Sequence, residues 1–172
     1  MPVNLELKAR IASLEAAEAR ARAAGAGFRD TLSQVDTYFR VAHGRLKLRE
    51  QKGGPSELIY YERAEDTAER WSSYEKEPVA EPEALTRMLS RALGVLAVVA
   101  KERRLYLYRG ARIHLDEVRG LGSFVEFEVP ATDEETSEIM KELRQVLAIE
   151  ERDVIKYSYS DMILGESFSP EA

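Results

Sequence analysis

Short segments in which apolar and polar residues alternate run along most of this chain. Residues 44–50 show the pattern most clearly, because Leu46 and Leu48 share one face while Arg45, Lys47 and Arg49 share the other. A period of two predicts a half-buried β-strand. Three cations on one face repel each other, so this face favours an anion opposite it, and a phosphate suits that charge. Taken alone, the pattern favours an ordinary solvent-exposed strand face over an anion site.

The same reading predicts further strands and three helices along the chain. Glycine-containing turns separate many of the strands, and short strands joined in this way predict an antiparallel sheet or barrel. The helix over 82–93 should bury Leu85, Met88, Leu89 and Ala92, and the helix over 132–147 should begin at a capping box at 132–135. A chain of 172 residues with no evident linker predicts a single domain over 1–172. The predicted strands are 3–10, 34–41, 44–50, 57–63, 71–79, 95–103, 105–109, 113–118 and 123–130, with the remaining helix at 13–24.

Composition excludes several kinds of site. The chain has no cysteine, which removes disulfides and thiol nucleophiles, and its two histidines cannot by themselves complete a zinc site. The net charge of -6 argues against broad binding of nucleic acid or of anionic membranes. The longest apolar run, 93–100, is too short to cross a bilayer, and no signal-like segment opens the sequence, so we expect a cytoplasmic protein.

An acidic strand complements the basic one. Glu126 and Glu128 share one face of the segment 123–130, roughly 7 Å apart along the strand, close enough to share a hard cation. Asp116 lies on another alternating strand, and Glu6 lies near the amino terminus. Together these carboxylates form a candidate Mg²⁺ or Mn²⁺ site, although Glu-x-Glu on an exposed strand is usually only solvated.

One arrangement would bring the charged faces together: a barrel with a polar, water-filled interior. Its cations would neutralise phosphate oxygens and its carboxylates would hold a metal, which is what phosphoryl chemistry requires. A two-layer protein with the same faces in water fits the spacing equally well. The inward residues of the barrel would be Glu6, Lys8, Arg45, Lys47, Arg49, Asp116, Glu126 and Glu128.

Several motifs, in order along nearly the whole chain, resemble the CYTH or triphosphate tunnel metalloenzyme family, which includes class IV adenylate cyclases, thiamine triphosphatases and inorganic triphosphatases. The first is Asn4-Leu-Glu6-Leu-Lys8, against the family's Glu-x-Glu-x-Lys strand. The hairpin of 36–39 and 44–50 and the strand 59–63 follow. The last is the carboxylate hairpin, with His114-Leu-Asp116 and Glu126-Phe-Glu128.

The resemblance implies an α+β fold, a closed eight-stranded antiparallel β-barrel flanked by helices whose polar tunnel binds triphosphates. It implies a divalent-metal-dependent adenylate cyclase or triphosphatase acting on ATP, thiamine triphosphate or tripolyphosphate, and leaves room for a homodimer. Glu6, Asp116 and Lys8 would be the catalytic residues. The metal ligands would be Glu6, Glu126, Glu128 and Asp116, and the phosphate-binding residues would be Lys8, Arg45, Lys47, Arg49, Arg104 and Lys156. Arg103 lies next to Arg104 on the opposite strand face, and the sequence leaves open which of the two points inward.

Two positions depart from the family pattern. Asn4 replaces the first glutamate of the motif, which should weaken metal binding, and Glu62 stands where some members carry a lysine. Both departures favour the alternative function, a non-catalytic protein that binds polyphosphate or a nucleotide. His114 shares a strand face with Asp116, and a structural role is expected for it more than a role inside the tunnel.

Overall fold

The computed structural model describes residues 2–63, 68–132 and 135–165. Its strands form one antiparallel sheet in the order β5-β4-β3-β2-β6-β7-β8-β1-β9. Hairpin connections place most neighbours in sequence beside each other, and the pairing of β2 with β6 spans the two halves of the chain. The strands are β1 (Val3–Arg10), β2 (Gly27–Phe39), β3 (Arg45–Gln51), β4 (Ser56–Arg63), β5 (Arg70–Val79), β6 (Val95–Tyr108), β7 (Ala111–Val118), β8 (Gly122–Pro130) and β9 (Val154–Ile155).

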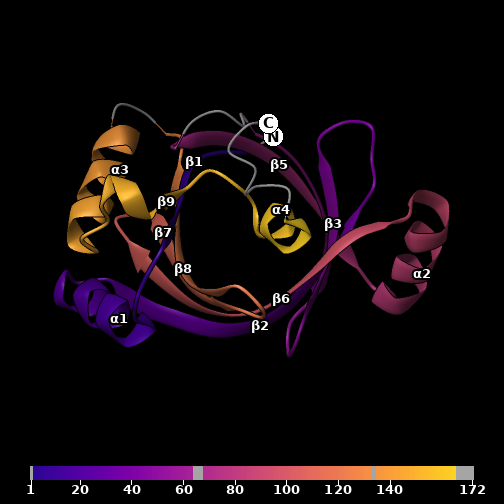
Figure 1. The fold of residues 1–172 in the computed structure, drawn as a ribbon, viewed down its shortest axis with the longest axis horizontal. Helices are drawn as coiled ribbons and strands as arrows, with labels where there is room; N and C mark the ends of the chain where they lie inside the picture. Colours follow the sequence, from indigo (N-terminus) through magenta and orange to yellow (C-terminus); the bar gives the residue numbers. More distant parts are fainter. Residues whose placement is uncertain (1, 64–67, 133–134, 166–172) are drawn as a thin grey trace.

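An extra pairing closes the sheet into a barrel. Residues 3–6 of β1 pair with β5, while 8–9 of the same strand pair with the short β9. Strands β1 to β8 therefore form a closed ring, and the predicted eight-stranded antiparallel barrel is confirmed (Figure 1). The helices are α1 (Leu14–Ala23), α2 (Pro82–Leu93), α3 (Glu135–Val146) and α4 (Tyr159–Leu164), with a 3₁₀ turn at Glu151–Asp153.

The larger of two apolar cores lies on the outside of the barrel wall, and a smaller one, which includes Ile59 of the cavity lining, lies inside next to α4. On β1, the apolar face carries Leu5 and Leu7, and both belong to a core shared with α1 and α3. On β8, Val125 and Phe127 join the same core and are 0% exposed. Because successive side chains on a strand point to opposite faces, the charged residues between them face into the barrel. The predicted polar interior follows directly from this alternation.

Four predictions about elements differ from the structure. β2 begins at Gly27 instead of residue 34, and β6 is one continuous strand instead of two, because no turn residue interrupts it near residue 104. β9 and α4 were not predicted. The capping box expected at 132–135 includes residues 133–134, which lie outside the described part of the chain.

The predicted buried stripe of α2 is wrong. Among the described residues of this helix none is buried, and Met88 is 63% exposed. The helix lies at the end of the barrel beside β3 (Figure 1), where it contacts β2 and β3 but its apolar stripe stays half-buried or exposed. None of the helices in the described ranges is long and apolar enough to cross a membrane.

Candidate functional site

The barrel encloses a cavity of about 680 Å³, including its open mouth, whose lining is mainly charged. Every barrel strand except β2 and β4 contributes a charged side chain or an asparagine to it, and α4 contributes from one end. The charged and amide residues of the lining are Asn4, Glu6, Lys8, Lys47, Arg49, Lys76, Lys101, Arg103, Arg112, Glu126 and Glu128.

A buried carboxylate holds three cations together on one wall. Asp36 of β2 is 0% exposed and receives Nη2 and Nε of Arg49 at 2.8 Å, Nζ of Lys101 at 2.9 Å and Nζ of Lys47 at 3.1 Å. Burial alone would raise the pKa of Asp36, but Lys101, Lys47 and Arg49 outweigh it and hold the pKa well below its usual range. One negative charge therefore orients three positive ones beside the cavity.

Lys101 is the most strongly perturbed of these cations. Burial lowers its pKa from 10.5 to about 7, although the neighbouring Asp36 carboxylate opposes that shift. Arg49, Arg103 and Lys47 add repulsion in the same direction as burial. An additional anion in the cavity would relieve this repulsion.

A second buried carboxylate, Asp116 of β7, lies behind the cavity wall. It is 0% exposed, and Arg103 donates to both of its oxygens at 2.7 Å. Tyr159 of α4 donates its hydroxyl proton to Asp116 Oδ2 at 2.7 Å. Asp116 therefore fixes the guanidinium of Arg103, and Arg103 itself lines the cavity.

The opposite wall is acidic. Glu6 on β1 stands directly across from Glu128 on β8, and Lys8 stands across from Glu126, with Nζ 3.6 Å from Glu126 Oε2. Carboxylates facing each other across a strand pair repel unless a cation lies between or beside them. Arg112 of β7 meets Glu128, donating from Nε and Nη2 to Oε2 at 2.9 and 2.6 Å.

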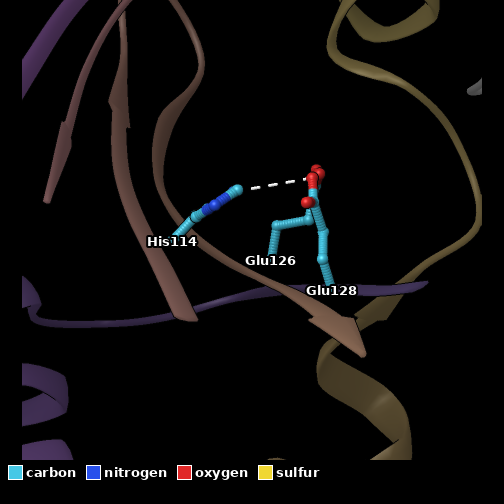
Figure 2. A group of neighbouring side chains, drawn as sticks. All are labelled: His114, Glu126 and Glu128. Atoms are coloured by element: carbon cyan, nitrogen blue, oxygen red, sulfur yellow. Dashed lines mark ion pairs between the residues drawn. The ribbon is translucent and has the colours of Figure 1, made fainter. Parts of the chain in front are cut away.

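His114 completes a compact group with the two glutamates. Its imidazole extends from β7 toward the carboxylates of Glu126 and Glu128 on β8 (Figure 2). One ligand atom from each of the three residues lies within 4.8 Å of the others. Burial lowers the pKa of His114 well below 6.5, so the imidazole is neutral at pH 7 and can offer a lone pair.

Helix α4 crosses the opening of the barrel (Figure 1). Arg45 of β3 donates to both oxygens of Asp161 at 3.1 Å and to Ser158 Oγ at 2.9 Å, which ties the start of the helix to the barrel. The Lys8 ammonium lies 3.9 Å from the centre of the Tyr159 ring. Contacts from α4 thus reach both the acidic and the basic wall.

The structure brings six of the predicted site residues to one cavity, namely Glu6, Lys8, Lys47, Arg49, Glu126 and Glu128. Four others lie elsewhere. Asp116 sits behind Arg103, and Arg45 contacts α4. Arg104 faces outward, 2.9 Å from Glu18 of α1, because it has the opposite strand parity from Lys101 and Arg103. Lys156 is exposed on the segment after β9.

The sequence prediction missed several cavity residues. Lys101 was missed, and Arg103 was left as an open alternative to Arg104. The predicted break near residue 104 hid the alternation of Val99, Lys101 and Arg103 on one continuous strand. Glu62, which stands where some family members carry a lysine, faces away from the cavity and accepts a hydrogen bond from the Tyr60 hydroxyl on the outer face. The cation in that part of the cavity is Lys76 of β5, whose partner across the strands is Ile59.

Comparison with known proteins gives the family. A sequence model of the CYTH domain matches residues 3–159, so the chain belongs to the CYTH domain family. No functionally curated protein matched the sequence. The Pyrococcus horikoshii protein PH1012 superposes with a TM-score of 0.83 at 25% identity, over 92% of this chain and 98% of that one.

Two further solved structures share the fold. A candidate adenylate cyclase from Vibrio parahaemolyticus has a TM-score of 0.77 at 20% identity, over 94% of this chain and 97% of its own. The candidate adenylyl cyclase HpAC1 from Hippeastrum, described as having a dominant triphosphatase activity, has a TM-score of 0.69 at 17% identity, over 99% and 98%. The chain is thus a CYTH tunnel domain over nearly its whole length.

Proposed function

We propose that this protein is a divalent-metal-dependent enzyme that acts on a nucleoside or organic triphosphate inside the barrel. The observation that carries the proposal is the division of one cavity into a basic wall and an acidic wall. A triphosphate needs cations along its length and a metal site beside the phosphate that reacts. Membership of the CYTH family supports the same reaction class.

The basic wall would bind the phosphates. Lys47, Arg49 and Lys101 are held in place by Asp36, and Arg103 by Asp116, so their positions are set before a ligand arrives. Preorganised cations in a water-restricted site bind and stabilise phosphate charge more strongly than mobile surface cations. We assign Asp116 to the positioning of Arg103, since its oxygens already accept three hydrogen bonds.

The acidic wall would hold the metal. Glu6, Glu126 and Glu128 converge from adjacent strands and fit a hard divalent cation, Mg²⁺ or Mn²⁺. Such a cation supplies charge neutralisation at the phosphate oxygens when it is bound. Lys8, which lies against Glu126 and the Tyr159 ring, would contact the phosphate nearest the metal.

A specific residue favours a second candidate function, a protein that binds polyphosphate or a nucleotide without turning it over. Asn4 lines the cavity and is 4% exposed, so a neutral amide occupies the place of a family carboxylate inside the barrel. Fewer anionic ligands mean weaker metal binding. Phosphate binding by the basic wall would survive that loss.

One experiment separates these functions. Purified protein is incubated with ATP, thiamine triphosphate or tripolyphosphate, each with Mg²⁺ or Mn²⁺, and the products are identified. Cyclic nucleotide with pyrophosphate indicates a cyclase, and orthophosphate indicates a triphosphatase. If tripolyphosphate binds but no product forms across a titration of both metals, the enzyme hypothesis is rejected and the binding function remains.

A further inference from the structure

The imidazole of His114 has an unusual environment for a buried histidine. The residue is 5% exposed, and within the described residues its Nδ1 atom has no hydrogen-bond partner. A buried polar nitrogen without a partner is costly, so its position requires an explanation. A carboxylate oxygen, Glu128 Oε1, lies 3.8 Å from this atom.

That distance is too long for a hydrogen bond but suits two atoms that share a cation. Ligand bonds of about 2.0–2.2 Å place two ligand atoms on one ion about 3–4 Å apart. Arg112 bonds the other oxygen of Glu128, Oε2, which leaves Oε1 directed toward the imidazole. The ligand atoms of His114, Glu126 and Glu128 lie within 4.8 Å of one another, so small side-chain rotations bring all three to one ion.

We propose that Nδ1 of His114 is a metal ligand together with Glu126 and Glu128, and that this chain therefore selects a first-row transition metal, such as Mn²⁺ or Co²⁺, over Mg²⁺. The inference deepens the proposed function, because it specifies the metal of the same cavity. Two carboxylates alone suit hard ions, whereas an added imidazole favours transition metals, which bind nitrogen much better than Mg²⁺ does.

The position of Asn4 agrees with this assignment. Where the family motif has a carboxylate on β1, this chain has the neutral amide of Asn4 in the cavity lining. On β7, the neutral imidazole of His114 approaches Glu126 and Glu128. The site therefore combines less anionic charge with a nitrogen donor. Both differences weaken Mg²⁺ binding relative to transition metals.

Pulsed electron paramagnetic resonance of bound Mn²⁺ tests the ligand directly, because a coordinated imidazole nitrogen gives a ¹⁴N coupling. The chain has only two histidines, and the other, His43, is exposed before β3. In untagged H43Q protein, any coordinated imidazole must therefore be His114. We expect the coupling in the parent and in H43Q, and its loss in H114N, whose amide can replace nitrogen by oxygen at the same place.

Calorimetric titration gives the selectivity. H114N should weaken Co²⁺ binding at least about tenfold and Mg²⁺ binding less than about threefold, while H43Q changes neither. Absence of the ¹⁴N coupling from Mn²⁺-loaded H43Q, or failure of Mn²⁺ to bind, would overturn the inference even if H114N does not fold. Coupling in a protein that converts no triphosphate would instead reject the proposed enzyme and leave the ligand assignment standing.

Discussion

Individual charges inside the barrel are balanced by near neighbours. Asp36 meets three cations and Asp116 meets Arg103, at distances of 2.7–3.1 Å. Because one carboxylate cannot neutralise three cations, the basic wall keeps an excess of positive charge that only a further anion can balance. Burial, together with repulsion from the neighbouring cations of this wall, lowers the pKa of Lys101 to about 7.

Anion binding should therefore depend on pH through Lys101. Without ligand, its ammonium loses its proton as the pH rises through about 7. A bound triphosphate raises this pKa, so binding takes up a proton and affinity falls as the pH rises above 7, by up to about tenfold per unit. Calorimetry of tripolyphosphate binding between pH 7 and 9, in buffers of different ionisation enthalpy, measures the uptake.

The matched variant is K101R, because arginine stays charged throughout this range. The ligand's own titration is common to both proteins, so the difference between their pH profiles isolates residue 101. The affinity of K101R for tripolyphosphate should change less with pH than that of the parent. On binding, K101R should also take up fewer protons than the parent, by up to one. Identical profiles for the two proteins would show that Lys101 does not titrate on binding.

Neutralising Glu128 should weaken metal binding while leaving the stability of the fold nearly unchanged. E128Q removes a metal ligand and also the repulsion with Glu6 directly across the strand pair. The loss of its ion pair with the partly exposed Arg112 costs below about 1 kcal/mol. We expect metal affinity to fall at least about tenfold and turnover with it, while the melting temperature without ligand changes by less than ~5 °C.

E117Q is the control for that experiment. Glu117 is an exposed residue of β7 that bonds Ser123 on the outer face of the barrel. It loses the same charge without touching the cavity, so metal affinity should stay at the parental value. Parental turnover by E128Q across a metal titration would place the metal elsewhere.

Among the elements, α4 is the one whose position depends most on side chains. The helix has only six residues, too few to be stable alone, and it is held by Arg45, by its own capping box and by the bond from Tyr159 to Asp116. Its sequence contains no long apolar period that could have predicted it. Arg45, predicted to bind phosphate, instead contacts this helix.

Removing Arg45, whose contacts hold the start of α4 to the barrel, should loosen α4 alone. R45A deletes the fork to Asp161 and the bond to Ser158, so we expect local opening of the helix to become easier by about 1–3 kcal/mol. Hydrogen exchange measures this as faster exchange at residues 162–165, with unchanged exchange in β7 and β8. R45K keeps the charge but cannot form the fork.

The lysine variant separates the two roles of Arg45. If Arg45 acts as a tether, R45K exchanges at 162–165 nearly as fast as R45A does. If it acts chiefly through charge on a phosphate, R45K recovers tripolyphosphate affinity, and R45A loses as much affinity as R49A. The second pattern would restore the role predicted from the sequence.

For the whole molecule, strand alternation predicted the strands and their charged faces but fitted a two-layer protein as well as a barrel. The resemblance to the CYTH family was what implied the closed barrel. Glu126 and Glu128 face inward for the same reason that Val125 and Phe127 face the outer core. What the sequence could not provide is the register between strands. The meeting of Asp36 with Lys101, 65 residues away, depends on the pairing of β2 with β6, and only cross-strand pairing places His114 beside Glu126.

The alternation also failed where burial did not enforce it. The first residues of β2 form an exposed ribbon with the far end of β6, so no apolar face marks them as a strand. The choice between Arg103 and Arg104 stayed open for a different reason, since the supposed break between two short strands hid the parity of a single long one.

Tripolyphosphate should stabilise the folded barrel as a whole, because it binds the basic wall in the folded state and not in the unfolded chain. At 100 times its dissociation constant, a ligand adds about 2.7 kcal/mol, which raises the melting temperature by several degrees. Arg49 also bonds the buried Asp36, so R49A lowers the melting temperature without ligand as well. The ligand-induced shift, and not the melting temperature itself, therefore reports phosphate binding.

Outward-facing Arg104 supplies the matched control, since it pairs with Glu18 beside α1 and lies outside the cavity lining. We expect R104A to keep the parental shift, and R49A and K47A to lose most of it. R49A or K47A should cost roughly 2–4 kcal/mol of ligand affinity, because each removes a charged, partly desolvated phosphate contact. R104A should leave ligand affinity unchanged and cost below about 1 kcal/mol of fold stability, because it removes only an outer ion pair. A parental shift that survives both R49A and K47A would place the anion away from the wall formed by β3 and β6.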